Sequence, residues 1–280
     1  MTRDIRTLQT VGKATRYVGA VILMLIILIP FLWMISTSLS SVKAAYSLPP
    51  KWIPRHLNWE HYLYVLTVQN VFQYFLNSVE ISVSITVGQL AFCSMAAYAF
   101  ARLTFPGQKV LFALIISSLM IPLQVTIVPV FILMKWLHLL NTRGSLILPA
   151  LSSAFGVFFL RQFFLTVPRE LSESAKIDGA GNFTIFSRIF LPVSTAALSA
   201  LAVFTFLYFW NELLRPLIFL DSQSKKTLPL FILLLRSMNG GGDATEVMAG
   251  AAIAILPIFV VFLFAQRYIV EGIVMTGIKG

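Results

Sequence analysis

Long apolar stretches, separated by short segments that carry the charges, dominate the chain. Six charge-free runs approach the length of about 20 residues that a membrane-spanning helix needs, and they are Tyr17–Val42, Ile81–Ala101, Val110–Met134, Gly144–Leu160, Ile189–Asn211 and Val247–Gln266. A transmembrane β-barrel would instead show alternating segments of about ten residues. Because these runs are continuous, they indicate helices. The predicted fold class is an all-α integral membrane protein with six transmembrane helices.

The predicted domain boundaries follow from these runs and from the polar segments between them. Residues 1–16 form an N-terminal segment, 17–39 the first span, 40–76 a loop, 77–268 the core and 269–280 a tail. The predicted spans of the core are 77–101, 110–131, 142–164, 192–216 and 246–268, and a polar loop occupies 168–190. The aromatic residues of the 40–76 loop, Trp52 and Trp59 among them, predict a packed segment rather than a disordered linker.

Composition excludes an ordinary soluble domain. The 280 residues are 58% hydrophobic and 11% charged, whereas a soluble domain carries about 25% charged residues. The net charge of +10 is spread singly between apolar runs, which is typical of topology signals and not of a nucleic-acid interface. The single cysteine, Cys93, excludes a disulfide or a cysteine metal cluster within the chain.

The distribution of Lys and Arg favours an N-terminus inside the cell. With that orientation, twelve of the 21 basic residues fall on the inner side and nine on the outer side. Four of the twelve precede the first span, which usually dominates orientation. We therefore expect both termini and the 168–190 loop to be cytoplasmic, and the 40–76 loop to be periplasmic.

The 168–190 loop is the most distinctive polar segment. Pro168, followed by Glu170 and Glu173, predicts the start of a short helix. Asp178-Gly179 predicts its end, and Asn182 is a candidate cap for a second helix that runs to Leu191-Pro192. Small residues at the tip would let another backbone come close, so the loop is suited to a partner. The alternative is a solvated surface helix stabilised by pairs such as Glu173–Lys176.

The spacing of this loop resembles the EAA loop of type I ABC importer permeases. That pattern is E-A-A, three residues, G, nine residues and I-x-L-P. Here it reads Glu173-Ser174-Ala175, Gly179 and Ile189-Phe190-Leu191-Pro192, with every spacing kept and Ser174 as the one departure. The IDGAG run over 177–181 is similar to the carbohydrate-uptake branch of the family.

Two further stretches resemble the same branch, which contains the smaller permease subunit of the maltose transporter. Residues 209–217 (FWNELLRPL) are similar to its W-N-E-x-L-x-P-L segment. Residues 266–280 are similar to its Q-R-x-x-V-x-G…G-x-x-K-G tail.

The resemblance implies a heteromeric ATP-driven importer of a sugar or sugar-like solute in the bacterial inner membrane. The implied partners are a second homologous permease, two cytoplasmic ABC ATPase subunits, an extracytoplasmic solute-binding protein and the lipid bilayer, with no nucleic acid. The chain has no P-loop and no H-E-x-x-H, G-x-S-x-G or paired-cysteine motif. We therefore expect no cofactor or metal in this chain, with ATP and Mg²⁺ bound by the partner ATPase, and a transport subunit rather than an enzyme.

The resemblance also implies roles for individual residues. The ATPase-coupling residues would be Glu173, Ser174, Ala175, Asp178, Gly179, Ile189, Leu191 and Pro192. The tail would reach the ATPase through Gly277, Lys279 and Gly280. The binding protein would meet the loop at Asn239, Gly240 and Gly241.

Candidates for the substrate path are Trp210, Asn211, Glu212 and Gln124, since polar residues in membrane helices usually face a cavity. For the tryptophan segment, an interfacial anchor is the alternative. For Gln124 and Gln89, hydrogen bonding between helices is the alternative. The three histidines, His56, His61 and His138, are expected in loops as solvated or interfacial residues.

A permease for a non-sugar solute is the main alternative, and the sequence disfavours two other function classes. A stand-alone secondary transporter would couple to ions through mid-span acids, and Glu80 and Glu212 instead lie near predicted span ends. A membrane enzyme would need a catalytic constellation, and none is evident.

Overall fold

The computed structural model describes residues 2–49, 51–238 and 243–277. Within that part of the chain every regular element is a helix. The chain divides into two compact units. The first unit comprises residues 1–71 and 232–253, and the second comprises 72–231 and 254–280.

The first unit contains a long N-terminal helix and the loop that follows it. Its elements are α1 (Thr2–Ser38), α2 (Val42–Ala45), α3 (Glu60–Leu63) and a π-helical turn (Tyr64–Val68). To these it adds most of α14 (Leu228–Met238) and the start of α15 (Ala244–Gly277). The most apolar stretch of α1 has a mean hydropathy of 2.9, and none of it is buried within the structure. This surface is therefore available to lipid or to another subunit.

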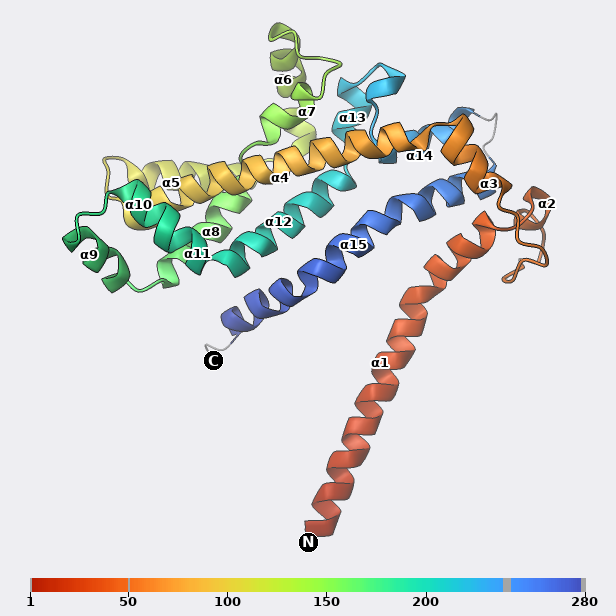
Figure 1. Ribbon diagram of the computed structural model, residues 1–280, viewed down its shortest axis with the longest axis horizontal. Helices are drawn as coiled ribbons and strands as arrows, with labels where there is room; N and C mark the ends of the chain where they lie inside the picture. The colour runs from red at the N-terminus through yellow and green to blue at the C-terminus, as the bar shows by residue number, and fades with distance from the viewer. Residues whose placement is uncertain (1, 50, 239–242, 278–280) are drawn as a thin grey trace. The chain divides into compact units, whose positions relative to one another are not determined.

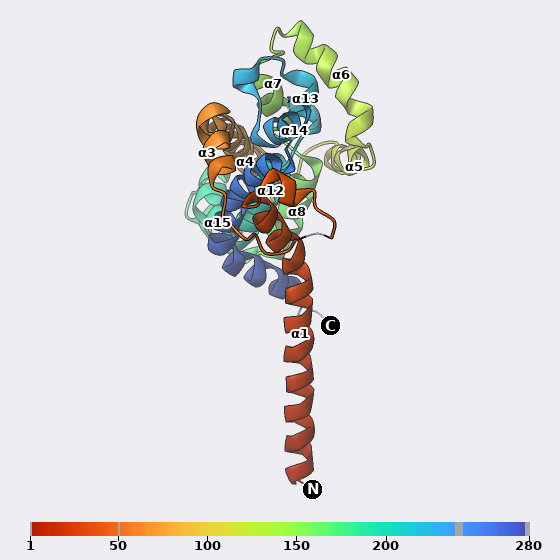
Figure 2. The ribbon, with the colours of Figure 1, turned by 90° about the vertical axis from the view of Figure 1, so that its right-hand side faces the viewer.

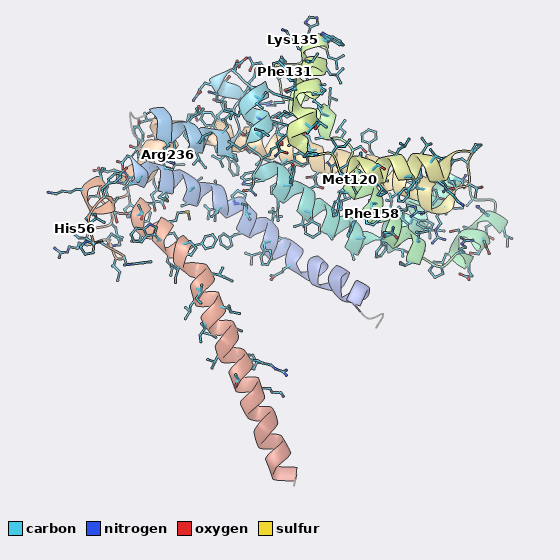
Figure 3. The ribbon with its side chains drawn as sticks, turned by 180° about the vertical axis from the view of Figure 1, so that it is seen from behind. His56, Met120, Phe131, Lys135, Phe158 and Arg236 are labelled. Atoms are coloured by element: carbon cyan, nitrogen blue, oxygen red, sulfur yellow. The ribbon has the colours of Figure 1, made fainter. Side chains whose placement is uncertain are left out.

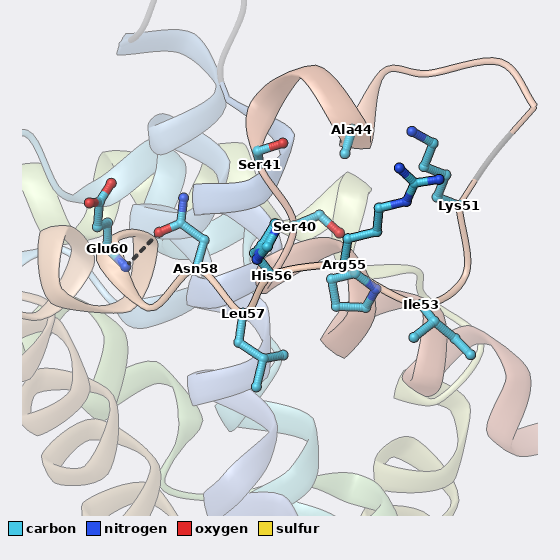
Figure 4. A pocket seen from close by; sticks show the side chains of 11 residues that line it. Ser40, Ser41, Ala44, Lys51, Ile53, Arg55, His56, Leu57, Asn58 and Glu60 are labelled. Atoms are coloured by element: carbon cyan, nitrogen blue, oxygen red, sulfur yellow. Dashed lines mark hydrogen bonds between the residues drawn. The ribbon is translucent and has the colours of Figure 1, made fainter.

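The segment after α1 folds back onto the end of that helix. Asn58 N donates to Leu39 O (2.9 Å), Ser36 Oγ donates to Trp52 O (2.5 Å), and Trp33 meets Trp52 edge to face at 4.9 Å. The prediction of a packed rather than disordered segment is confirmed. The segment encloses a hollow of about 400 Å³, with Lys51 and Arg55 on one side of it and Glu60 at the other (Figure 4).

The second unit is a helical bundle. Its elements are α4 (Val71–Arg102), α5 (Gln108–Ser118), α6 (Leu123–Trp136), α7 (Gly144–Ile147), a 3₁₀ turn (Leu148–Ala150), α8 (Ala154–Thr166), α9 (Glu170–Ile177), α10 (Asn182–Ile185), a π-helical turn (Phe186–Phe190), α11 (Leu191–Val193), α12 (Thr195–Trp210), α13 (Leu214–Phe219) and a 3₁₀ turn (Gln223–Lys225). Helices α4, α8 and α12 run alongside one another (Figures 1 and 2), and α9 and α10 lie at one end of this unit (Figure 1).

Glycine permits the close approach of α4 to α8 and to the segment just before α8. A Cβ at Gly88 would lie 2.4 Å from Leu151 Cδ2, and a Cβ at Gly156 would lie 2.9 Å from Cys93 Sγ. Small residues at such contacts are the usual means of packing helices in a membrane. The resulting core joins α4, α8, α10 and α12, and its buried members include Tyr98, Leu160, Phe164, Phe190 and Leu201.

Four helical segments have the length and apolar character of a membrane span: Thr15–Ser38, Val71–Arg102, Gly144–Thr166 and Ala244–Phe264. The number rises to six if two bent helix pairs each count as one span. The first pair is Gln108–Ser118 with Leu123–Trp136, bent by 105°, and the second is Asn182–Val193 with Thr195–Trp210, bent by 78°. The chain is therefore an all-α membrane protein, in agreement with the predicted class.

The third and fifth predicted spans are not continuous helices. Within 110–131 the helix breaks after Ser118 and restarts at Leu123, with Pro122 in extended conformation before it (ψ 147°). Proline removes a backbone donor and disfavours helical geometry at the residue before it. Within 192–216 a break at Ser194 precedes α12, which ends at Trp210 before a separate α13.

Candidate functional site: the α9 loop and the polar segments around it

The α9 loop is the polar segment 168–190, which contains α9 and α10. Helix α9 has acidic residues in its first turn and Lys176 in its last, which complements the helix dipole. The helix ends where the sequence predicts. Ala180 N donates to Ala175 O (2.9 Å) and Gly179 N to Lys176 O (3.0 Å), which is the pair of bonds of a Schellman motif. Gly179 has a φ of +82°, in the left-handed region that favours glycine.

The second helix of the loop begins with a different cap from the predicted one. Asn182 is the first residue of α10, Gly181 occupies the cap position, and no side chain caps the helix. The proposed Asn182 cap was therefore wrong, because extended Gly181 (ψ 162°) already turns the chain into the helix.

The motif residues divide between an exposed and an inward-facing set. The exposed residues are Glu173, Ser174, Asp178, Gly179 and Pro192. Ala175, Ile189 and Leu191 are half-buried and pack against the α4–α8–α12 core. The half-buried residues therefore pack the loop against its own bundle, and the exposed residues remain accessible to a partner.

Two large apolar side chains at the tip were missed by the sequence reasoning. Ile177 is 87% exposed and Phe183 is 74% exposed. Exposed apolar groups beside charged ones are typical of an interaction surface. The signal in the sequence was weak, since apolar residues are common throughout this chain.

Arg102, at the end of α4, anchors the approach to α9. Its Nη2 donates to Phe164 O (2.5 Å) and to Val167 O, and its guanidinium lies 5.0 Å from the centre of the Phe190 ring. The two carbonyls belong to the end of α8 and the linker before α9. Arg102 therefore ties α4 to the base of the loop.

A second arginine makes a similar link nearby. Arg161 of α8 donates from Nε to Phe100 O (3.1 Å) and lies 4.1 Å from the centre of the Phe112 ring. From the sequence, Arg102 and Arg161 were interpreted only as topology signals. Their partners are backbone carbonyls and rings from other helices, which no local pattern identifies.

The predicted substrate-path residues do not come together. Trp210 is buried (1% exposed), packs against Phe75 and Phe206, and donates from Nε1 to Ala254 O (3.1 Å). Asn211 and Gln124 are exposed, and Asn211 donates to Leu207 O of its own helix (2.7 Å).

The charge of Glu212 is satisfied within the same segment. Its two carboxylate oxygens accept from Arg215 at 2.5 and 2.7 Å, and both side chains are under one-tenth exposed. The Arg215 guanidinium also lies 4.9 Å from the Phe209 ring centre. A bidentate pair of this kind is strong and geometrically specific.

The expectation of solvated or interfacial histidines was wrong for His61. That side chain is 7% exposed, with Nε2 3.0 Å from Ser40 O and Nδ1 3.0 Å from Thr245 Oγ1. With Asp243 and Glu246 it forms the one group among the described residues that could hold a metal ion. Asp243 Oδ1 already accepts from Thr245 N (3.1 Å) and Oγ1 (2.8 Å) at the start of α15, so this cluster serves as a helix cap.

The remaining predicted contacts lie at or beyond the edge of the described structure. Gly277 is the last described residue of α15, and Lys279 and Gly280 lie outside the described residues. Asn239, Gly240 and Gly241 also lie outside them.

Residues 63–274 match the family described as the binding-protein-dependent transport system inner membrane component. This match spans most of the chain, and the fold is that of a helical membrane protein with a polar loop between its predicted fourth and fifth spans. The chain therefore belongs to this family of membrane permeases.

Its relatives are permease subunits of several uptake systems. It is 38% identical to the arabinooligosaccharides transport system permease protein AraQ of Halalkalibacterium halodurans over 81% of each chain. It is 33% identical to the diacetylchitobiose uptake system permease protein NgcG of Streptomyces coelicolor, covering 89% of this chain and 83% of the relative. It is 39% identical to the sn-glycerol-3-phosphate transport system permease protein UgpE of Yersinia pestis over 71% of each chain.

A solved structure has the same fold. It is the crystal structure of a bacterial ABC transporter involved in the import of the acidic polysaccharide alginate, and one of its chains matches this chain with a TM-score of 0.79 and 22% identity. The match covers 92% of this chain and 97% of that chain.

Proposed function

We propose that this chain is a membrane-spanning permease subunit of an ATP-driven, binding-protein-dependent importer for a sugar or sugar-like solute. The names of the relatives support the solute class, since they include oligosaccharide and glycerol-phosphate systems. The chain would act with a second homologous permease, two cytoplasmic ATPase subunits and an extracytoplasmic solute-binding protein. The alternating access of such transporters is rigid-body rocking of helix bundles about a central site.

The observation that carries the proposal is the exposed face of the α9 loop. Glu173, Asp178 and Gly179 are exposed at the end of a short helix whose inner residues pack on the core. Arg102 holds the segment entering this helix to α4. A push on α9 from an ATPase would therefore be transmitted to α4 and α8 through backbone hydrogen bonds and packed rings, and not through a flexible loop.

In this proposal both termini and the α9 loop are cytoplasmic, and ATP and Mg²⁺ are bound by the partner ATPase. Glu173 would pair with a basic residue of the ATPase, while Ser174 and Gly179 permit close approach. The Gly277–Gly280 tail would reach the same partner, and the Asn239–Gly241 loop would meet the binding protein.

A stand-alone secondary transporter is the second candidate, and the ion pairs disfavour it. Glu80 pairs with Arg143 (2.7 Å) and Glu212 pairs with Arg215 (2.5 Å). Both carboxylates are therefore already engaged by arginine, whereas ion coupling uses an intramembrane acid that is free to bind the ion.

The test compares three variants in the assembled transporter. Glu173→Lys reverses charge within the motif, Gly179→Asp adds a negative charge beside Asp178 on the exposed face, and Glu170→Lys is the matched control on the first turn of the same helix. We expect the first two to abolish ATP-driven uptake while membrane insertion persists, and the control to retain uptake. Wild-type uptake in Glu173→Lys and Gly179→Asp would contradict the proposal.

A further inference from the structure

The break between α5 and α6 opens a hollow within the second unit. Its volume is about 730 Å³, inside the range of about 300–1,000 Å³ typical of small-molecule sites. Its polar lining residues come from five parts of the bundle, and they are Gln89, Ser118, Thr126, Ser153, Thr205 and Tyr208. Met120, which is 86% exposed, marks the break itself (Figure 3).

The interruption of a candidate membrane span between α5 and α6 needs a structural explanation. The two halves meet at 105°, and the last carbonyls of α5 accept from N–H groups three residues on (Leu119 to Ile116, 3.0 Å; Ile121 to Ser118, 3.2 Å) in place of α-helical bonds. Such backbone is tolerated in a membrane where it is covered by protein or lines a cavity. Discontinuous helices also form the substrate sites of many transporters.

The lining carries no charge. None of the residues around the hollow is Asp, Glu, Lys or Arg. Transfer of an anion into such a site is unfavourable, because no cationic side chain compensates its charge. A neutral ligand carries no such penalty.

The lining does offer hydrogen bonds of both kinds. Ser118 and Thr126 donate to backbone carbonyls (2.7 and 3.1 Å), which leaves their oxygens free to accept. Ser153 Oγ accepts from Gly156 N (2.9 Å), which leaves its hydrogen free to donate. The hydroxyl of Tyr208, a side chain that is 56% exposed, has no partner among the described residues.

Gln89 holds the floor of the hollow in place. It is 5% exposed, donates from Nε2 to Ala150 O (2.8 Å) and accepts from Thr205 Oγ1 at 3.2 Å. Phe155, Phe204 and Phe209 add aromatic surface. Fixed polar groups beside aromatic faces suit a ring that is apolar on its faces and hydroxylated at its edge.

We propose that this hollow is a subsite for a neutral saccharide, and that its lack of charge discriminates against anionic solutes such as sugar phosphates and uronates. This inference rests on the proposed function and deepens it. The relatives' names include both kinds of solute: arabinooligosaccharides and diacetylchitobiose are neutral, whereas sn-glycerol-3-phosphate and alginate are anionic. The uncharged lining assigns this chain to the first group.

The test uses cysteine labelling in the complete transporter, reconstituted in nanodiscs. The only native cysteine of the chain, Cys93, is fully buried. Thr126→Cys places a thiol in the hollow, and Val125→Cys, at a neighbouring position that is 63% exposed but does not line it, is the control. N-ethylmaleimide labelling of this chain is followed by mass spectrometry, with arabinotriose, diacetylchitobiose, sn-glycerol-3-phosphate and a uronic acid trisaccharide as probes.

We expect Thr126→Cys to react, and at least one neutral probe to slow that reaction about fivefold or more while both anions leave it unchanged. Val125→Cys should show no protection. Failure of Thr126→Cys to react would mean that lipid or the second permease fills the hollow, and would overturn the proposal. Equal protection by anions, or protection by none of the probes, would overturn it as well.

A second readout examines Tyr208 without removing its ring. Tyr208→Phe should raise the half-saturating concentration for uptake of the protecting sugar into proteoliposomes by about threefold to tenfold, the value of one net hydrogen bond. Tyr17→Phe, at a tyrosine of α1 that is 73% exposed, should not change it. An unchanged concentration in Tyr208→Phe would contradict the proposed contact.

The same proteoliposomes separate this inference from the proposed function. ATP-driven uptake of an anionic solute would contradict the subsite proposal and leave the proposed function intact. Uptake that does not depend on ATP would contradict the proposed function itself.

Discussion

At the scale of single residues, Gly179 and Arg102 fix the two ends of helix α9 by different interactions. Gly179 supplies a left-handed backbone conformation at the end of α9. Arg102 satisfies two carbonyls before its start. The role of Gly179 as a helix terminator could be predicted from sequence, because turn chemistry is local. The role of Arg102 could not, because its partners lie more than 60 positions away.

Within this chain, the requirement at Gly179 is conformational and not steric. A Cβ there would meet no atom within 4 Å, but a left-handed non-glycine residue costs about 1–2 kcal/mol. Gly179→Val should therefore reduce ATP-driven uptake more strongly than Gly179→Asn, because Asn tolerates this conformation. Uptake by vesicles with equal transporter content is the measurement. Equal activity of the valine and asparagine variants would show that the left-handed turn is not needed.

Removal of the Arg102 side chain should weaken the attachment of the α9 loop to α4. Arg102→Ala leaves two carbonyls without their donor, at about 1–3 kcal/mol each if they stay dry. We expect a lower melting temperature of the purified complex and reduced uptake. Lys109→Ala, at an exposed residue near the same end of α4, is the control. A melting temperature equal to that of the control would contradict the anchoring role.

At the scale of elements, the apolar runs identified the helical segments but not their interruptions. Pro122 and Pro129 lie in the same charge-free run, yet α6 starts after Pro122 and contains Pro129. Both halves of the run are apolar, so hydropathy alone does not tell which proline interrupts the helix. The same limit explains His61, whose burial depends on α15, far along the chain.

The break itself should be sensitive to Pro122. Pro122→Ala restores a backbone donor and removes the restriction on Ile121, so the α5–α6 bend should relax and the hollow should shrink. We expect slower maleimide labelling of Thr126→Cys and reduced uptake in this background. Pro129→Ala, within α6, should change labelling of the same thiol much less. Identical labelling in the Pro122→Ala and parent backgrounds would show that the bend does not depend on this proline.

At the scale of the whole molecule, the proposed transporter subunit combines two features. One is the exposed α9 surface, where the ATPase is proposed to dock, and the other is a helical bundle that contains an uncharged hollow. The fold class and the family resemblance could be predicted from the sequence, since apolar length and motif spacing are local. The burial of Trp210 in the core and the pairing of Glu212 with Arg215 could not be predicted, because both depend on packing. Tyr208, two positions before Trp210, lines the hollow instead.

The most direct test of ATPase docking at α9 is site-specific cross-linking from the tip of this helix in right-side-out inner-membrane vesicles. Ile177→Cys is suitable, because that side chain is 87% exposed and lies outside the packed core. We predict an adduct with the ATPase subunit, and no reaction with a membrane-impermeant thiol reagent added to the periplasmic side. Absence of the ATPase adduct, or labelling from the periplasmic side, would contradict a cytoplasmic docking role for α9.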